Sequence, residues 1–329
     1  MGVRLVLASV CAIASSGSAS AGVAIPPSLR IEAEVTAVFE APAERPLRMP
    51  TDVAVDATGR VYVADGTNDR IVRFAPTGQA DGFITEGGGR ELRQPVGVSV
   101  DAQGRVWIAD TGNGRILIIA SNGQSTETVS LPVPSGADRT DPTDVAVTPD
   151  GTRAYVVDND NHRLVLRDNA TGQWTVLGSK GRGLGRFQWP FMICIGAEGY
   201  VYVSEAINTR VQRITADDRW AGAIGRWGVQ AGQLYRPKGV AADRQGRLYV
   251  SDSTLGVVQA FNARGAVEGV LTDALGAPLR FDHPMGMCFG DDGRLFVVEL
   301  GANRVAVVTI RTAAPVEKQL GRNEQRGGP

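Results

Sequence analysis

The pattern of apolar and polar residues in this chain repeats six times. In each copy a proline opens a short β-like run, a turn with Gly or Asp follows, and two further apolar runs come after it. The copies begin 45–48 residues apart, at Pro50, Pro95, Pro142, Pro190, Pro237 and Pro284. A period of this length, made of short strands and turns, is typical of a β-propeller with one four-stranded blade per repeat. The pattern therefore predicts an all-β, six-bladed β-propeller of four-stranded antiparallel blades.

The second copy illustrates the strands within a repeat. Its apolar runs predict strands at 96–101, 106–109 and 115–119, with one turn around Gly104 and another at 110–114. Residues 116–119 are apolar without interruption, as expected for a strand that neighbouring blades cover on both faces. A fourth strand is expected in the more variable stretch before the next proline.

The two ends of the repeat array predict how the ring closes. The sixth copy ends with its third strand at 305–310, whereas a β-like run at 34–39 precedes the first copy and has no inner strand of its own. We expect residues 34–39 to complete the last blade as its outermost strand, because this joins the two ends and leaves no unpaired strand edge.

The first 21 residues have the pattern of a secretory signal. Arg4 precedes an apolar run at 5–14 that is too short to span a bilayer, and Ala19-Ser20-Ala21 forms a small-residue cleavage site. The predicted organisation is a signal peptide at 1–21, a linker at 22–33, the propeller at 34–310 and a disordered tail at 311–329. We expect the mature chain to be exported from a bacterial cytoplasm, to the periplasm or beyond, and to be a monomer.

The overall charge excludes some classes of partner. The net charge is −1, and 21% of the residues are charged. This balance provides no general attraction to nucleic acid or to anionic lipid, and no segment after the signal is apolar enough to span a membrane. The expected partner is a protein or a small-molecule ligand that a local patch recognises.

Three stretches carry a more specific motif: VYVADGTNDRIVRF at 61–74, VWIADTGNGRILII at 106–119 and VYVSEAINTRVQRI at 201–214. Together with the linker GSKGRGLGRFQWP at 178–190, they resemble the NHL repeat, and the resemblance extends over all six copies. It implies the propeller fold. It does not select a function, because NHL-type propellers include RNA binders, protein-interaction modules, sensor domains and a few lyases.

An acidic residue closes the second strand of most copies, and an arginine follows five residues later. Because the pairs recur around the ring, we expect them to form a structural network that holds the turn. A ring of carboxylates could instead bind a cation. The pairs are Asp65 and Arg70, Asp110 and Arg115, Asp158 and Arg163, Glu205 and Arg210, and Glu299 and Arg304.

Positions that differ between copies are better candidates for binding. The residues near each opening proline are expected beside the mouth of the central channel, on the same face as the turn between the second and third strands. The candidate ligand-binding residues are Asp52, Asp144, Trp189, Phe191 and Lys238. A concave, partly apolar mouth with a few polar groups is the usual form of a ligand site. The alternative is that the two aspartates only cap local turns.

A second candidate is the Gly-rich loop at 181–186. It is not followed by Lys-Ser/Thr and does not join a strand to a helix, so it lacks the context of a phosphate-binding loop. Lys180, Arg182 and Arg186 nevertheless form a basic cluster beside aromatic residues that could hold an anionic or sugar ligand. A solvated crossover between two blades is the alternative.

No catalytic residues are predicted. The two histidines, His162 and His283, belong to different copies and cannot supply the three-histidine zinc site of the amidating lyases that this repeat resembles. Cys194 and Cys288 occupy equivalent positions two blades apart, too far for a disulfide, and are expected to be free thiols packed as small apolar residues.

These observations favour a non-catalytic binding or scaffolding module that recognises a protein or a small ligand at the channel mouth. No cofactor is predicted, although Asp52 and Asp144 could contribute to a calcium site. The alternative function is a divalent-metal-dependent hydrolase, similar to a gluconolactonase, or a lyase with its site at the channel mouth.

Overall fold

The computed structural model describes residues 25–123 and 125–311. Strands dominate this part of the chain, and its helical segments are three short 3-10 turns, η1 (Pro27–Leu29), η2 (Gly66–Asn68) and η3 (Thr111–Asn113). None of these turns has the length or the apolar character that a membrane crossing requires. The predicted signal peptide and all but the first residue of the predicted tail lie outside the described residues.

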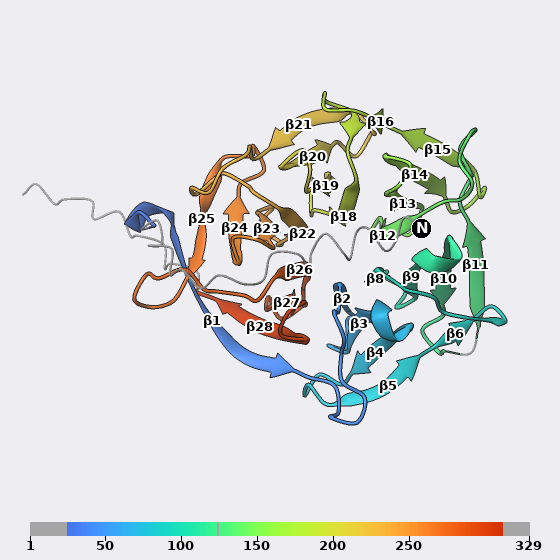
Figure 1. Cartoon of the computed structure of the whole chain (residues 1–329), viewed down its shortest axis with the longest axis horizontal. Coiled ribbons are helices and arrows are strands. Elements are labelled where there is room, and N and C mark those ends of the chain that lie inside the picture. The colour runs from blue at the N-terminus through green and yellow to red at the C-terminus, as the bar shows by residue number, and fades with distance from the viewer. Residues whose placement is uncertain (1–24, 124, 312–329) are drawn as a thin grey trace, which may run out of the picture.

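Four sheets each contain four antiparallel strands that follow one another along the chain. In each sheet the first strand lies nearest the centre of the molecule and the fourth at its rim (Figure 1). From the centre outwards the sheets are β2 (Asp52–Val55), β3 (Val61–Asp65), β4 (Arg70–Phe74) and β5 (Ala80–Ile84); β8 (Gly97–Val100), β9 (Val106–Asp110), β10 (Arg115–Ile119) and β11 (Thr126–Ser130); β12 (Pro142–Val147), β13 (Arg153–Asp158), β14 (Arg163–Asp168) and β15 (Trp174–Leu177); and β18 (Pro190–Ile195), β19 (Val201–Glu205), β20 (Arg210–Ile214) and β21 (Trp220–Ile224).

The remaining long strands form one eight-stranded sheet with the order β22-β23-β24-β25-β1-β28-β27-β26. Its strands are β1 (Arg30–Phe39), β22 (Pro237–Ala242), β23 (Leu248–Asp252), β24 (Val257–Phe261), β25 (Val267–Thr272), β26 (Pro284–Phe289), β27 (Leu295–Glu299) and β28 (Arg304–Ile310). Two short ladders, β6 (Glu86–Gly87) with β7 (Arg90–Glu91) and β16 (Ser179–Lys180) with β17 (Arg186–Phe187), lie in loops between sheets.

The strand β1 connects the beginning of the chain to its last repeat. Residues 33–39 pair in antiparallel register with β28, and residues 30–32 pair in parallel register with β25. The β-like run expected at 34–39 therefore begins four residues earlier, at Arg30. In Figure 1 this strand, drawn in blue, runs beside the red β28.

Burial explains why the apolar runs are continuous in the middle strands. Every residue of β9 and of β10 is buried, whereas Val129 is the one buried residue of the outermost strand β11. The middle strands are covered on both faces by adjacent sheets, so both faces carry apolar side chains. The outer strand faces solvent, and its polar sequence TETVS shows no apolar run from which it could be predicted.

The turn between the first two strands is closed by an aspartate and a glycine. Oδ1 of Asp101 accepts hydrogen bonds from the backbone N–H groups of Gln103 and Arg105, at 3.0 and 2.9 Å. Gly104 has a φ of 72°, a left-handed conformation that glycine adopts at little cost. Such Asx turns explain why Asp and Gly recur at the turns between the strands of each repeat.

The first strands of the repeats surround a central channel. β2, β8, β12, β18, β22 and β26 each contact the next strand in this order, and β26 contacts β2. Side chains of these strands line a cavity of about 260 Å³, which we call the channel cavity. The fold thus brings the residues that follow the opening prolines to one axis, although they are far apart in the sequence.

Candidate functional site

The five acid–arginine pairs form ion pairs, each within its own repeat. The distances between arginine Nε and a carboxylate oxygen are 2.6–2.8 Å for Asp65–Arg70, Asp110–Arg115, Asp158–Arg163, Glu205–Arg210 and Glu299–Arg304. Charge-assisted pairs of this length hold their turn firmly when they are buried and hydrogen-bonded.

The pair Asp65 and Arg70 shows which segments of the chain these ion pairs hold together. Oδ1 of Asp65 accepts a hydrogen bond from the backbone N–H of Arg48, and Oδ2 accepts one from Asn68 Nδ2, both at 2.9 Å. Nη2 of Arg70 donates to the backbone carbonyls of Arg45 and Pro46. The pair thus ties the segment before the first strand to the turn between the second and third strands. Both carboxylate oxygens of Asp65 thus accept hydrogen bonds from other residues of the same repeat region.

The residues after the opening prolines lie in two separate hollows. The residues directly after the prolines all line one pocket, the mouth pocket, and these are Thr51, Val96, Thr143, Phe191, Lys238 and Met285. Gly66 and Thr67 of η2 also line it, so this pocket lies on the face of the turn between the second and third strands. The next residues along the chain, among them Asp52 and Asp144, line the channel cavity instead.

The five predicted mouth residues therefore do not share one opening. Phe191 and Lys238 line the mouth pocket, whereas Asp52 and Asp144 line the channel cavity. Successive side chains of a strand point in opposite directions, which separates neighbours in the sequence. Trp189 lies on the surface with 40% of its area exposed, and its ring packs edge-on against His162 at 4.6 Å between ring centroids.

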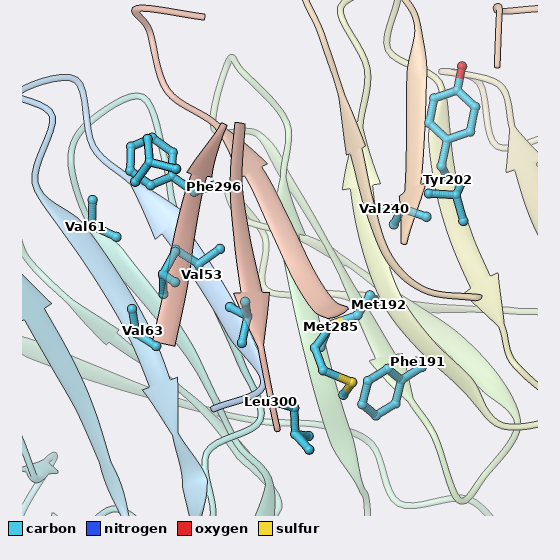
Figure 2. Close-up of a cluster of buried hydrophobic side chains, with 14 of the residues drawn as sticks. Val53, Val61, Val63, Phe191, Met192, Tyr202, Val240, Met285, Phe296 and Leu300 are labelled. Atoms are coloured by element: carbon cyan, nitrogen blue, oxygen red, sulfur yellow. The ribbon is translucent and has the colours of Figure 1, made fainter. Parts of the chain in front are cut away.

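The mouth pocket is small and mainly apolar. Its volume is about 50 Å³, which is room for a few water-sized groups at roughly 10–15 Å³ each. Figure 2 shows the Phe191 ring beside the Met285 side chain, with Leu300 close by. Apolar walls of this kind suit the hydrocarbon part of a small ligand.

Lys238 brings a polar group into this apolar pocket. The residue is 7% exposed, and its Nζ lies 4.1 Å from the centroid of the Phe191 ring, a cation–π contact. Burial, and after it the charge of Arg236, lowers the pKa of Lys238 to about 8. No carboxylate of residues 25–123 or 125–311 forms an ion pair with its amine.

Asp141 lines the same pocket from the start of the third copy. It is 3% exposed, and within the described residues its Oδ1 has no hydrogen-bond partner. Burial, followed by the charge of Asp160, raises the pKa of Asp141 to about 7. The sequence gives no sign that Asp141 lines a pocket, because the position before the opening proline holds a different residue in every copy.

Asp52 and Asp144 bridge neighbouring blades across the channel wall. Oδ2 of Asp52 accepts a hydrogen bond from the backbone N–H of Val98, at 2.9 Å. Asp144 accepts one from the N–H of Ile193 on Oδ2, at 2.8 Å, and one from Val145 on Oδ1, at 2.7 Å. Val98 and Ile193 belong to the inner strands of the next repeats. The two aspartates are thus inter-blade contacts as well as local ones.

Burial shifts the acidity of both carboxyls. It raises the pKa of Asp52 to about 7, although the N–H groups of Val98 and Val53 act in the opposite direction. Burial, and after it the charge of Asp52, raises the pKa of Asp144 well above its ordinary value of 3.8. Two carboxyls that interact in this way titrate as a pair, so we expect the pair to retain a proton near neutral pH.

Glycines make room for the two aspartates. A Cβ at Gly286 would lie 2.0 Å from Asp52 Oδ1, and a Cβ at Gly97 would lie 2.7 Å from Asp144 Oδ1. Each glycine occupies the position equivalent to the aspartate, one repeat earlier around the ring. This alternation of glycine and aspartate is the signal in the sequence that could have identified the inter-blade contacts.

The aspartate pair predicts a pH-dependent stability. An aspartate of the unfolded chain loses its proton near the ordinary pKa of 3.8, whereas native Asp52 retains its proton up to a pKa of about 7. Between these values the native state binds more protons, so the free energy of unfolding falls as pH rises, by about 1.4 kcal/mol per pH unit for each retained proton. Urea unfolding of the protein and of Asp52→Asn/Asp144→Asn from about pH 4 to about pH 7 measures the difference. Equal slopes would contradict the shifted pKa of the pair.

The two cysteines among the described residues, Cys194 and Cys288, are free thiols in the channel wall. Burial raises the pKa of both; the second cause is the charge of Asp144 for Cys194 and of Asp52 for Cys288. Since the thiolate is the reactive and metal-binding form, neither cysteine is a good nucleophile or ligand. Nor does the described part of the chain place three or more His, Cys, Asp or Glu side chains together around a possible metal ion.

The basic loop is an exposed connection between two blades. Lys180, Arg182 and Arg186 are exposed to solvent, while β16 and β17 pair in parallel across the loop. Nη2 of Arg210 donates to the carbonyls of Gly183 and Arg186, at 2.9 and 2.7 Å, which fastens the loop to its blade. These contacts are consistent with a connection between two blades that hydrogen bonds from Arg210 hold in place.

Comparison with known proteins identifies the repeat. Residues 47–74 and 92–119 match the family model described as NHL repeat. No curated protein sequence matches the chain.

Solved structures of several enzymes and binding proteins share the fold. A streptogramin B lyase aligns with a TM-score of 0.61 at 14% identity, over 84% of this chain and 98% of that chain. A gluconolactonase from Xanthomonas campestris aligns with a TM-score of 0.60 at 15% identity, over 87% and 98%. A chain of a nidogen/laminin complex aligns with a TM-score of 0.56 at 17% identity, over 74% and 85%. At these identities the likeness concerns the fold alone. The chain is therefore an all-β protein that carries NHL repeats and has a fold similar to that of β-propeller proteins.

Proposed function

We propose that this protein is an exported, six-bladed propeller that binds a small ligand in the mouth pocket without catalysing a reaction. The antiparallel pairing of β1 with β28 supports a ring whose last blade is completed by the N-terminal strand. The apolar run and the small-residue site within residues 1–21 support export.

The observation that carries the binding proposal is the position of Lys238. All six repeats contribute the residue after their proline to one apolar pocket, and one of these residues is a buried lysine without an ion-pair partner among the described residues. A buried amine of this kind gains from a ligand that supplies an acceptor. The ligand is a short hydrocarbon chain that contacts Phe191, Met285 and Leu300 and ends in a carbonyl or carboxylate oxygen at Lys238.

Binding accounts for this site better than metal-dependent hydrolysis. A hard divalent ion needs several oxygen ligands that are free to coordinate it. Both carboxylate oxygens of Asp144 accept backbone N–H groups, and Asp52 accepts one from the neighbouring blade. These carboxyls also lie in the channel cavity, apart from the mouth pocket.

Butanoate is the probe for this proposal. Millimolar butanoate is expected to raise the melting temperature of the mature protein, because a ligand that binds the native state stabilises it. Lys238→Met removes the amine at similar volume and should abolish the rise. Lys180→Met, which removes an exposed lysine, should leave it unchanged. An equal rise in the Lys238→Met protein would contradict binding at the mouth pocket.

A further inference from the structure

The basic residues of this chain are unevenly divided between arginine and lysine. The sequence has 34 lysine and arginine residues, and the lysines are Lys180, Lys238 and Lys318. Arginine stays charged at every pH a protein meets, whereas a lysine in an apolar site can lose its proton and become a nucleophile. The basic residue of the mouth pocket is thus the type that can react.

The surroundings of Lys238 favour its neutral amine. The side chain is nearly buried, and the apolar side chains of Met285 and Leu300 line the same pocket. Within residues 25–123 and 125–311 no carboxylate forms an ion pair with the Lys238 amine. Burial lowers the pKa of this amine to about 8. A lysine with this pKa is unprotonated in roughly one molecule in ten near neutral pH, compared with fewer than roughly one in a thousand for an ordinary pKa of about 10.4.

A carboxyl group with an unused oxygen lines the same pocket. Oδ1 of Asp141 is buried and lacks a hydrogen-bond partner in the described part of the chain, and this residue is 3% exposed. No ion pair joins Asp141 to Lys238 among the described residues, so the amine stays free to condense with a carbonyl group in a pocket too small for much water.

We propose that Lys238 captures short-chain aldehydes as a reversible imine in the mouth pocket, an inference that rests on the proposed ligand-binding function of this pocket. The lone pair of Nζ attacks the aldehyde carbon, and a proton moves from nitrogen to the former carbonyl oxygen to give a carbinolamine. The hydroxyl takes up a proton from solvent and leaves as water while the C=N bond forms. The iminium nitrogen then returns a proton to solvent. The sum is amine plus aldehyde to imine plus water, without oxidation or reduction.

The experiment treats the mature protein with propanal and sodium cyanoborohydride near neutral pH and locates propyl groups by peptide mass spectrometry. The hydride reagent converts the imine to a stable secondary amine. We expect Lys238 to be labelled at least about tenfold faster than Lys180, because its neutral fraction exceeds that of an ordinary lysine by about a hundredfold. Butanoate should slow the labelling of Lys238 and leave that of Lys180 unchanged.

Two controls separate this inference from the proposed function. Lys180→Arg should retain the fast label at Lys238, and Lys238→Arg should leave the slow label at Lys180 unchanged. Labelling of Lys238 no faster than that of Lys180, while butanoate still raises the melting temperature, overturns the imine and leaves the binding function in place. If butanoate also has no effect on melting, both proposals fall.

Discussion

A protein that lacks residues 25–39 is expected to have no cooperatively folded structure at room temperature. Heating it should therefore show no cooperative unfolding transition. The deletion removes β1, which pairs with β28 along residues 33–39 and with β25 along residues 30–32. It also exposes the edges of β25 and β28, and unpaired edges in a propeller promote aggregation. Calorimetry and near-ultraviolet circular dichroism of the truncated protein measure the effect. A transition like that of the undeleted protein would contradict the proposed closure of the ring by β1.

Point variants of β1 test the same contact without removing the strand. Phe39 is 3% exposed. Its ring centroid lies 5.8 Å from that of Phe74 and 5.9 Å from that of Phe296, so Phe39 joins the first repeat to the last. Phe39→Ala should cost about 3–5 kcal/mol of the free energy of unfolding. Its neighbour Val38 is 40% exposed, and Val38→Ala should cost less than about 1 kcal/mol. Equal losses would mean that Phe39 does not join the two ends.

Gly286→Ala is expected to destabilise the protein by about 3 kcal/mol or more, because overpacking of a rigid site forces the backbone to move. The new Cβ would lie 2.0 Å from Asp52 Oδ1 and 2.8 Å from Asp52 Cα. Alanine is otherwise compatible with the backbone here, since Gly286 does not have a positive φ. Urea unfolding provides the free energy.

A double-mutant cycle assigns this loss to Asp52. Asp52→Gly removes the carboxylate, so Gly286→Ala should cost less in that background, and the coupling should be about 1–3 kcal/mol. Gly183→Ala is the matched control, because a Cβ there meets one side-chain atom at 3.9 Å and the residue has no positive φ. It should change stability by less than about 1 kcal/mol. Additive effects of Asp52→Gly and Gly286→Ala would contradict the close approach of the two blades.

Local patterns predicted much of the fold. The strand predicted at 115–119 is observed as β10 with the same bounds, and that at 106–109 is observed as β9 with one more residue. These strands can be predicted from the sequence because both of their faces are buried and therefore apolar. The outermost strand β11 could not be placed, because its solvent-facing residues have no apolar run.

The candidate site depended more on tertiary structure. The opening prolines correctly pointed to the residues that surround the channel, but Asp52 and Lys238 do not share the one opening that was expected for them. The direction of each side chain separates them into two hollows. Asp141 was missed because its unpaired oxygen results from the packing around it, which has no counterpart in the residues beside it in the chain.

By itself, the sequence determined the repeat, its period, the order of strands within each copy and the turns that Asp and Gly close, because each depends on residues close together in the chain. The tertiary structure decided that β1 lies between β25 and β28, that Gly286 faces Asp52, and that Lys238 and Asp141 line one pocket. These contacts join residues from different repeats. They arise from how the blades pack around the axis, a relation that no local pattern of apolar and polar residues encodes.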